Sequence, residues 1–467
     1  MKLDKILTVI SHDLSKQNMR AIVVGGAVRD YILGIQAKDF DIEIYGIKSI
    51  KELEKILCKY GSVNLIGKSF GVLKFTYDGR TYDFSLPRKD SKSGDGHRGF
   101  SVLTESDMDF DEAAKRRDFT INAMGYDIES GIFIDPFNGA MDIKKKIIRH
   151  IDSHTFVDDP LRVYRAIQFA ARFKFEVSED TFALLKKMVK EGALDELPKE
   201  RIYEEWKKFL LQSDKPSIAF YLMRELGIIK RYFPELHLLI NTAQDPRWHP
   251  EGDVWTHSMM AVDEMAMELK IRYEELRFDD SQKLILLFAI LCHDLGKPLS
   301  TSIEKDGRIR SIGHERAGLL PTKSLISRLT DEQDMIKYIL PLVEHHLKPP
   351  QFYKAGAKAG AIRRLSVKVD IDSLILVAKA DSLGRGGNDN KKREYLAGEW
   401  LSTEAQKLNV LHEAPKPFVR GRDLIASGMK PSPKFAEILD KLYQLQLDGE
   451  VQSKEEAMKF TSLNVLK

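Results

Sequence analysis

Strand-type alternation of polar and apolar residues is confined to the first third of this 467-residue chain. Residues 72–77 and 81–86 predict a hairpin across Asp78-Gly79, which is a favoured turn pair. From Pro160 onward the spacing of apolar residues is helical almost throughout, and no repeat recurs. The sequence therefore predicts an α+β fold, in which a small head of mixed sheet and helices precedes a long all-α body.

Changes in composition along the chain predict four parts. Strand signals become scarce near residue 150, the segment 241–250 is rich in turn residues, and glycines meet polar residues at 385–392. We therefore expect four domains with the following ranges: 1–150, 151–240, 241–390 and 391–467.

The composition excludes several classes of protein. With 43% apolar and 31% charged residues, the chain is neither disordered nor fibrous. Two cysteines, Cys58 and Cys292, are too few for a disulfide framework or a thiolate zinc site. The longest apolar run, 284–292, is too short for a membrane span and suits a buried helix, and charges interrupt the N-terminus too early for a signal peptide. We expect a cytoplasmic protein without a membrane partner. The net charge of +3 does not decide whether it binds nucleic acid, and the oligomeric state stays open.

The segment VVGGAVRDYILGIQAKDFDIEIYG places two glycines before an acidic strand. Gly25 and Gly26 separate a strand from a helix start, where free backbone N–H groups can hold a phosphate, although a simple tight turn also explains them. A period of two puts Asp39, Asp41 and Glu43 on one face of the following strand. Adjacent carboxylates of this kind can bind Mg²⁺ together with a substrate phosphate, and the alternative is a solvated acidic face.

These residues resemble the nucleotidyltransferase superfamily of DNA polymerase β, and more closely its bacterial-type branch of tRNA CCA-adding enzymes and poly(A) polymerases. The matching residues are GGAVRD at 25–30 and KDFD at 38–41. The resemblance implies a polymerase-β-like nucleotidyltransferase head in which Asp39 and Asp41 are catalytic and hold Mg²⁺. It also implies a third carboxylate from a neighbouring strand, for which Asp83 in YDFSLPR is the candidate. Glu43 is the rival, unless it is simply a solvent-facing residue.

Two further motifs fit the same family. The segment RRDFTINAM at 116–124 matches it nearly letter for letter, and it implies contacts to ribose and phosphate. Asp159 and Arg162 share one helical face, where a carboxylate and a guanidinium can read the donor and acceptor edge common to cytosine and adenine. The family form is Glu-Asp-x-x-Arg, and Asp158 stands where Glu is usual. The residues expected to bind the nucleotide are Gly25, Gly26, Arg29, Arg116, Arg117, Asp118, Asn122, Asp159, Arg162 and Arg165.

Seven of the twelve histidines fall between residues 237 and 346. Histidines and aspartates on well-separated helices favour a metal site, because imidazole and carboxylate both suit divalent transition metals. Their order resembles the HD phosphohydrolase superfamily, which implies an HD domain that hydrolyses a phosphoester at a divalent transition metal. A helical domain that binds tRNA without hydrolysing anything is the alternative. The expected ligands are His257, His293, Asp294 and Asp381 for the main metal, and His314 with His345 or His346 for a second.

The order of motifs matches HD-bearing CCA-adding enzymes: a head, a nucleotide-reading and RNA-binding helical region, an HD domain and a tRNA-binding tail. The tail has Pro431-Ser432-Pro433 where Pro-Gly-Pro is usual. The resemblance implies addition of C and A to the 3′ end of tRNA from CTP and ATP. From its polar, glycine-bearing composition and its place in the chain, we expect the segment 89–99 to be a loop that repositions the head between the two additions. The alternatives are a poly(A) polymerase, an enzyme that adds only CC or only A, and an HD phosphodiesterase or phosphatase. The residues expected to contact tRNA phosphates are Lys144, Lys145, Lys146, Lys354, Lys358, Arg363 and Arg364.

Overall fold

The computed structural model describes residues 1–37, 39–66, 71–87, 89–92, 100–103, 108–272, 275, 277–386 and 393–464. The chain forms two compact units. The first comprises Met1–Phe209 and Tyr221–Ile228, and the second comprises Leu210–Phe220 and Ile229–Lys467. The finer division into four parts stays a prediction.

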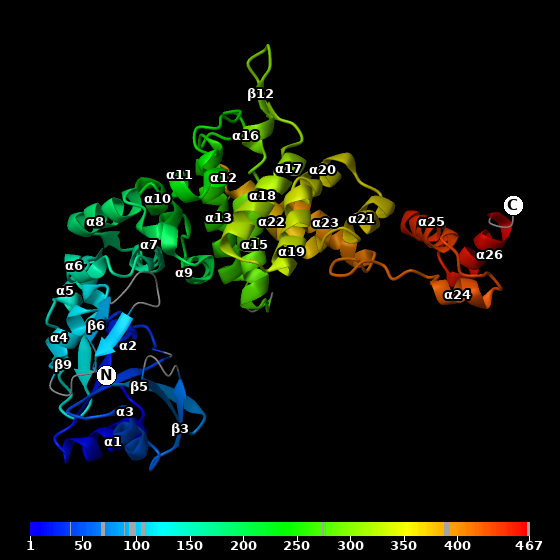
Figure 1. Cartoon of the computed structure of the whole chain (residues 1–467). Coiled ribbons are helices and arrows are strands. Elements are labelled where there is room, and N and C mark those ends of the chain that lie inside the picture. The colour runs from blue at the N-terminus through cyan, green and yellow to red at the C-terminus, as the bar shows by residue number, and fades with distance from the viewer. Residues whose placement is uncertain are drawn as a thin grey trace. The chain divides into compact units, whose positions relative to one another are not determined.

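A seven-stranded mixed sheet forms the centre of the first unit, with the strand order β3-β4-β5-β2-β1-β8-β9 (Figure 1). The predicted strand 81–86 lies within it and pairs antiparallel with its hairpin partner. The apolar residues of the central strands are buried, because helices cover the sheet. Its strands are β1 (Arg20–Val24), β2 (Asp41–Tyr45), β3 (Ser62–Ile66), β4 (Val72–Tyr77), β5 (Arg80–Ser85), β8 (Gly125–Asp127) and β9 (Phe133–Ile134).

The helices of the first unit follow the predicted order of a head and then a run of helices. Two short strands, β10 (Ile147–Ile148) and β11 (Glu176–Val177), pair in parallel between them. The helical elements are α1 (Lys5–Ser15), α2 (Gly26–Ile32), α3 (Ile50–Leu57), α4 (Phe110–Lys115), η1 (Thr120–Asn122), α5 (Gly139–Lys145), α6 (Ser153–Phe156), α7 (Leu161–Phe173), α8 (Glu179–Lys190) and η2 (Ala193–Glu196). Three more helices contain residues of both units: α9 (Lys199–Gln212), α10 (Ser217–Glu225) and α11 (Ile228–Tyr232).

The segment 89–99 begins as a strand. Residues Lys89–Lys92 form β6, which pairs antiparallel with β7 (Phe100–Leu103). The predicted loop is therefore wrong for 89–92, because ladder hydrogen bonds order a polar segment that has no apolar alternation. Residues 93–99 lie outside the described residues, and the repositioning role stays a prediction.

The second unit is helical apart from one short hairpin, within the residues that the structure describes. Its central helix α15 is buried over most of its length, from Leu284 to Cys292, as the apolar run predicts. The elements are α12 (Pro234–His237), α13 (Val254–Ile271), α15 (Asp280–Cys292), α16 (Lys297–Ser300), β12 (Thr301–Ile303), β13 (Ile309–Ser311), α17 (His314–Ala317), α18 (Leu319–Leu329), α19 (Gln333–His345), α20 (Lys348–Ala355), α21 (Ala359–Ser366), α22 (Ile371–Leu383), α23 (Leu396–Lys407), α24 (Gly421–Ala426), α25 (Lys434–Asp448) and α26 (Lys454–Asn464).

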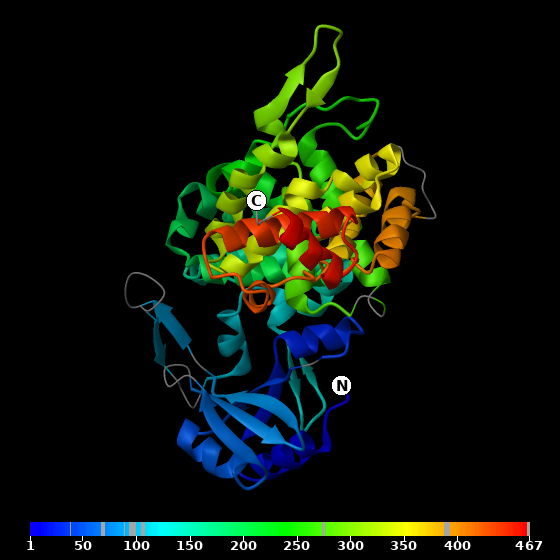
Figure 2. The same ribbon diagram turned by 90° about the vertical axis from the view of Figure 1, so that its right-hand side faces the viewer.

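The last three helices form a small group with an apolar core of its own (red in Figure 2). Leu424, Ile438 and Leu442 are buried in it, together with Val451 and Ala457. Across the described ranges, none of the helices has both the length and the apolarity needed to cross a membrane. The mixed sheet followed by helices confirms the predicted α+β fold.

One glycine lets two elements of the second unit approach closely, and its replacement provides a test of this packing. A Cβ at Gly296, where α16 begins, would lie 2.0 Å from the carbonyl oxygen of His314 in α17. We expect Gly296→Ala to lower the free energy of unfolding by about 1–3 kcal/mol, because backbone atoms must move to admit the methyl group. The measurement is the thermal melting temperature. Gly421→Ala is the matched control, since a Cβ there has no atom within 4 Å. A Gly296→Ala protein as stable as the control would contradict the close approach.

Candidate active sites

Two of the predicted catalytic carboxylates lie side by side in the central sheet. Strands β2 and β5 run parallel, and Asp41 pairs with Asp83 in their register. The Asp83 N–H also donates to the carbonyl of Phe40 at 3.0 Å. Paired residues of adjacent strands share a face, so both carboxylates emerge on the same side of the sheet. Asp39 is exposed and lies two residues before the strand begins, so its predicted place on the strand is wrong.

The electrostatics of this carboxylate group favour a cation. Partial burial raises the pKa of Asp41, and repulsion from the neighbouring Asp83, Glu43 and Asp39 adds to that rise. The nearby guanidinium of Arg117 opposes it. A divalent cation with oxygen ligands would relieve the same repulsion, and Mg²⁺ needs only one or two carboxylates when substrate phosphates complete its shell.

Glu43 is committed to a buried ion-pair network. Its side chain accepts hydrogen bonds from the Tyr45 hydroxyl at 2.8 Å and from Arg116 and Arg117 at 2.9 and 2.8 Å. Burial alone would raise the Glu43 pKa, but the charges of Arg117 and Arg116 hold it below its usual value. The solvent-facing interpretation of Glu43 is wrong, because only 2% of the residue is exposed. With Glu43 engaged in this way, Asp83 is the better placed third carboxylate.

Gly25 is required by the backbone and by a neighbour. Its φ is +70°, and a Cβ there would lie 3.0 Å from a guanidinium nitrogen of Arg117. Its N–H donates to the carbonyl of Met124 at 3.3 Å, so the expectation of a free N–H at this position is wrong. The glycine instead lets the Arg117 side chain lie next to the end of β1. Gly26 begins α2 directly after it.

A chain of hydrogen bonds joins α2, η1 and α7. Arg29 donates to the Asn122 side chain at 2.6 Å, and Asn122 donates to Asp118 at 2.9 Å. Arg165 donates to the other carboxylate oxygen of Asp118 at 2.6 Å. Burial would raise the Asp118 pKa, but the charge of Arg165 and the Asn122 hydrogen bond lower it. Arg29 is 5% exposed. In this structure its guanidinium links α2 to Asn122 and is not free to bind a phosphate.

The predicted reading pair stands at the start of α7. Asp159 accepts from the Leu161 N–H at 3.2 Å and pairs with Arg201 at 3.3 Å. Arg162 donates to the backbone carbonyls of Arg116 and Thr155 at 2.6 and 2.9 Å. Helix α7 therefore begins directly after Pro160, where helical spacing is predicted to start, whereas base reading stays a prediction.

In the second unit, the histidines and aspartates of separate helices meet in one buried cluster. His257 lies on α13, His293 and Asp294 follow α15, and Asp381 lies on α22. The His257 and His293 Nε2 atoms lie 3.3 Å apart, and His257 Nε2 is 3.0 Å from an Asp381 oxygen. His293 Nε2 lies 3.2 Å from Asp294.

A second group of metal-binding side chains lies next to the first, and the two oxygens of Asp294 face one group each. His314 Nε2 lies 3.3 Å from the other Asp294 oxygen and 3.3 Å from His346 Nε2. Within the described residues, His257, His293 and Asp381 form one group that can hold a metal ion, and Asp294, His314 and His346 form another. His345 belongs to neither of these groups, so the structure favours His346 over its neighbour.

The four imidazoles are held with Nε2 toward the centre. His293, His314 and His346 use Nδ1 to bond the backbone carbonyls of Ile290, Ser311 and Val343 at 2.6–2.7 Å. His257 Nδ1 lies 2.9 Å from Glu251. Burial lowers the pKa of His346 to about 3, which keeps this ring in the neutral form that binds metals. This donor set fits a divalent transition metal.

Sequence reasoning missed several residues around this cluster. Glu251 accepts from His249 and His257, and it also accepts from the Gly386 N–H at 2.9 Å. Lys297 lies 2.7 Å from Asp294, and Arg385 lies 3.2 Å from Asp381. Burial would raise the pKa of Asp294, but the charges of His293 and Lys297 keep it well below its usual value. For these missed residues the sequence held one signal: Asp294 and Lys297 are three positions apart, a spacing that places them on one turn.

The predicted RNA-contacting residues divide into two groups. Lys144, Lys145 and Lys146 are exposed around the end of α5, and Lys354 and Lys358 are exposed around the end of α20. Two arginines are occupied by the tail instead. Arg363 donates to the Leu447 carbonyl at 3.2 Å, and Arg364 pairs with Asp448. The structure therefore assigns these two arginines to packing of α21 against α25.

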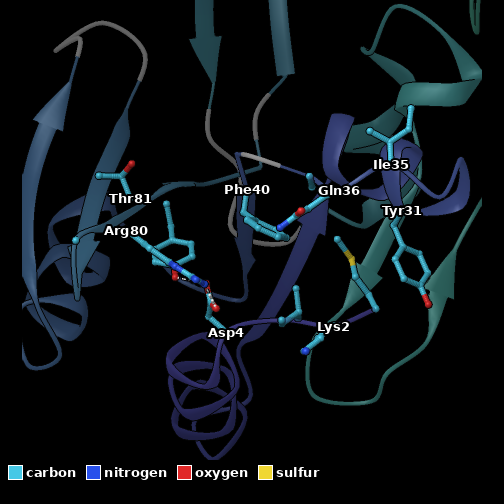
Figure 3. Close-up of a pocket in the computed structure, with 13 residues that line it drawn as sticks. Lys2, Asp4, Tyr31, Ile35, Gln36, Phe40, Arg80 and Thr81 are labelled. Atoms are coloured by element: carbon cyan, nitrogen blue, oxygen red, sulfur yellow. Dashed lines mark hydrogen bonds and ion pairs between the residues drawn. The ribbon is translucent and has the colours of Figure 1, made fainter. Parts of the chain in front are cut away.

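The first unit contains a cavity of about 970 Å³, and the predicted catalytic residues Asp39, Asp41 and Asp83 are not among the residues that line it (Figure 3). The rings of Phe40 and Tyr82, which line it, lie 6.4 Å apart. Figure 3 shows Arg80 and Asp4 beside them. Because side chains alternate along β5, Tyr82 points to the face opposite that of Asp83. Tyr82 and Asp83 therefore emerge on opposite faces of β5, and Asp39, Asp41 and Asp83 do not line this cavity.

Family models match three segments of the chain. The model described as a Poly A polymerase head domain matches residues 21–149. The probable RNA and SrmB-binding site of polymerase A matches 174–239, and the HD domain matches 254–386.

Two relatives and two solved structures extend this likeness over nearly the whole chain. The multifunctional CCA protein of Acinetobacter baylyi is 30% identical, covering 94% of this chain and 98% of its own. That of Laribacter hongkongensis is 34% identical, covering 81% and 88%. The Bacillus stearothermophilus CCA-adding enzyme in complex with CTP has a TM-score of 0.66 at 19% identity, covering 98% of this chain and 97% of its own. The Thermotoga maritima CCA-adding enzyme complexed with tRNA has a TM-score of 0.60 at 22% identity, covering 100% and 97%. At these identities the structural likeness shows the shared fold.

The role of Glu251 can be tested by metal binding. We expect Glu251→Gln to weaken the affinity of the second unit for a divalent transition metal about tenfold to a hundredfold, because the His257 ring loses the carboxylate that orients it. The measurement is a titration of metal-free protein with Mn²⁺, Co²⁺ or Ni²⁺ against a chelator of known affinity. The matched control is Asp306→Asn, which removes an exposed carboxylate paired with Arg308. Equal affinities for the two variants would contradict this role.

Proposed function

Because the chain belongs to the family of multifunctional CCA proteins, we propose that it is a tRNA nucleotidyltransferase that adds C and A to the 3′ end of tRNA. CTP and ATP are the proposed donors, and pyrophosphate is the proposed leaving group. The observation that carries this proposal is the pairing of Asp41 with Asp83 directly beside the Gly25 turn and Arg117. The cytoplasm is the proposed location, in keeping with the two unpaired cysteines.

The proposed site divides its work among a few side chains. Asp39, Asp41 and Asp83 would hold Mg²⁺, which supplies activation of the tRNA 3′-hydroxyl and neutralisation of charge on the leaving pyrophosphate. Arg117 is held by Glu43 beside Asp41, where its guanidinium can bind the triphosphate.

Base reading is assigned to Asp159 and Arg162. A carboxylate accepts from the exocyclic amino group of cytosine or adenine, and a guanidinium donates to the neighbouring ring nitrogen. The contact between Asp159 and Arg201 is long at 3.3 Å and partly exposed, so a base can replace it at little cost. Arg162 is already fixed by two backbone carbonyls and must exchange one of them for the base.

The tRNA itself is proposed to be bound by its phosphates and shape. Lys144, Lys145, Lys146, Lys354 and Lys358 are the exposed cations proposed for this role. Such contacts carry no sequence information, which suits an enzyme that accepts every tRNA.

A second function is proposed for the second unit, where Asp294 lies between two metal-capable groups: one oxygen is 3.3 Å from His314 of its own group, and the other is 3.2 Å from His293 of the neighbouring group. We infer that it hydrolyses a phosphoester. A divalent transition metal held by these residues supplies an activated water. Lys297 and Arg385 place positive charge at the same cavity, where a substrate phosphate would enter.

The nucleotidyltransferase proposal is tested with tRNAs that end at the discriminator base, at C and at CC, each with CTP, ATP or both. We expect extension to CCA followed by a halt. Asp41→Asn and Asp83→Asn should each lower incorporation at least about a hundredfold, because each removes a proposed metal ligand. Asp78→Asn, in the exposed hairpin turn, is the matched control. Long A tails would indicate a poly(A) polymerase. Addition of CC alone or A alone would indicate an enzyme with only part of the activity.

The hydrolase proposal is tested separately with Asp294→Asn. This variant should lose phosphoester hydrolysis in the presence of Mn²⁺, Co²⁺ or Ni²⁺ at least about a hundredfold, since the carboxylate belongs to one metal-capable group and contacts His293 of the neighbouring one. It should keep full CCA addition, because the metal-binding, triphosphate-binding and base-reading groups proposed for that reaction all lie in the first unit. Asp306→Asn again serves as the control. Hydrolysis by Asp294→Asn at the wild-type rate would contradict the proposal.

A further inference from the structure

An exposed tryptophan stands at the metal cavity of the second unit. Trp248 is 67% exposed, yet it lines the same cavity of about 240 Å³ as Asp294, His314 and His346. The other tryptophans are mostly shielded: Trp206 and Trp255 are fully buried, and Trp400 lies against Tyr353. An indole left in water beside a cluster of metal-binding residues offers a flat apolar surface for a ligand.

The turn that carries Trp248 is fixed to the metal cluster. Pro246 precedes it, and the N–H groups of Trp248 and His249 both donate to the Asp245 carbonyl at 3.0 Å. His249 is in turn held by Glu251 at 2.9 Å, and the same carboxylate orients His257. The backbone that carries the indole is therefore anchored relative to the metal-binding imidazoles, which favours a defined binding role for the side chain.

The rest of the cavity offers groups that match the other parts of such a ligand. Ile309 and Ser311 of β13 line it, and this strand belongs to the hairpin that stands out from the helices of the second unit (Figure 2). The hairpin is held at its base by a 2.7 Å hydrogen bond between Thr301 and Ser311. Lys297 and Arg385 provide cationic groups in the same cavity. An aromatic rim and a cationic, metal-binding floor fit a molecule with a planar ring at one end and a phosphate at the other.

We propose that Trp248 stacks on the base of the phosphoester bound in this cavity and so determines a preference for base-bearing substrates. This inference rests on the proposed hydrolase function and deepens it by naming a specificity-determining residue. Every nucleobase has a π-face, so stacking on an aromatic side chain supports binding without base-specific hydrogen bonds. The same chemistry is offered by a free mononucleotide and by the 3′ end of an RNA.

The first test compares phosphomonoesters with and without a base, using the full-length protein loaded with Mn²⁺, Co²⁺ or Ni²⁺. The probes are AMP, a short RNA ending in a 3′-phosphate, and glycerol 2-phosphate. We expect Trp248→Ala to lower the ratio of kcat/KM for AMP to that for glycerol 2-phosphate about tenfold to a hundredfold, through KM. Trp248→Phe should restore most of the ratio, and Trp400→Phe is the matched control. A loss confined to the RNA would identify the RNA end as the source of the base. An unchanged ratio for both base-bearing probes would overturn the proposal.

A second measurement does not depend on hydrolysis. We expect AMP to quench tryptophan emission of the metal-loaded wild type and of Trp400→Phe, and to leave the emission of Trp248→Phe unchanged. If the wild type hydrolyses none of the three probes but this quenching is seen, the hydrolase proposal fails and the stacking role of Trp248 stands. Absence of quenching in the wild type by both AMP and the short RNA would overturn the stacking role, whether or not hydrolysis is observed.

Discussion

The buried carboxylate of Glu43 is the interaction on which the proposed nucleotidyltransferase site depends. It ties β2, which carries Asp41, to Arg116 and Arg117 beyond α4. The carbonyl of Arg116 then accepts from Arg162, so the start of α7 is fixed to the same point. Removing one partner of a buried ion pair leaves an uncompensated charge that costs about 3–5 kcal/mol. The acidic strand, the arginine proposed to bind the triphosphate and the helix proposed to read the base are thus held in register by one side chain.

Buried carboxylates in the second unit are also compensated by neighbouring positive groups, but the partners differ from those of Glu43. Asp294 and Asp381 are almost fully buried, and they keep their charge because Lys297, Arg385 and the imidazoles surround them. The imidazoles are aimed by backbone carbonyls and by Glu251 rather than by each other. Positive charge therefore remains next to the carboxylates at the cavity, which is what a phosphate ligand requires.

Local patterns predicted the elements well, and pairings between distant segments were the harder part. Period two correctly placed Asp41 on the acidic strand, whereas Asp39 lies two residues before the strand begins. The partner of Glu43 lies more than seventy residues away and decided whether that side chain was exposed. The choice of His346 over His345 depends on which side of α19 faces α17, which adjacent residues cannot reveal. Glu251 and Trp248 lie in a turn-rich segment without periodicity, so no pattern singled them out. The strand β6 is defined by its hydrogen-bonded partner and not by its own residues.

The two sites differ in how complete they are before a substrate arrives. Among the described residues, the groups that can close around a metal all lie in the second unit, where imidazoles and carboxylates already converge. The carboxylates of β2 and β5 form no such closed group, and Mg²⁺ prefers to keep several ligand positions for water and phosphate. The proposed Mg²⁺ therefore binds well only together with the nucleoside triphosphate, whereas the metal of the second unit binds to a prepared site. This difference follows from ligand chemistry, and it would let one chain use the two proposed kinds of metal without exchanging them.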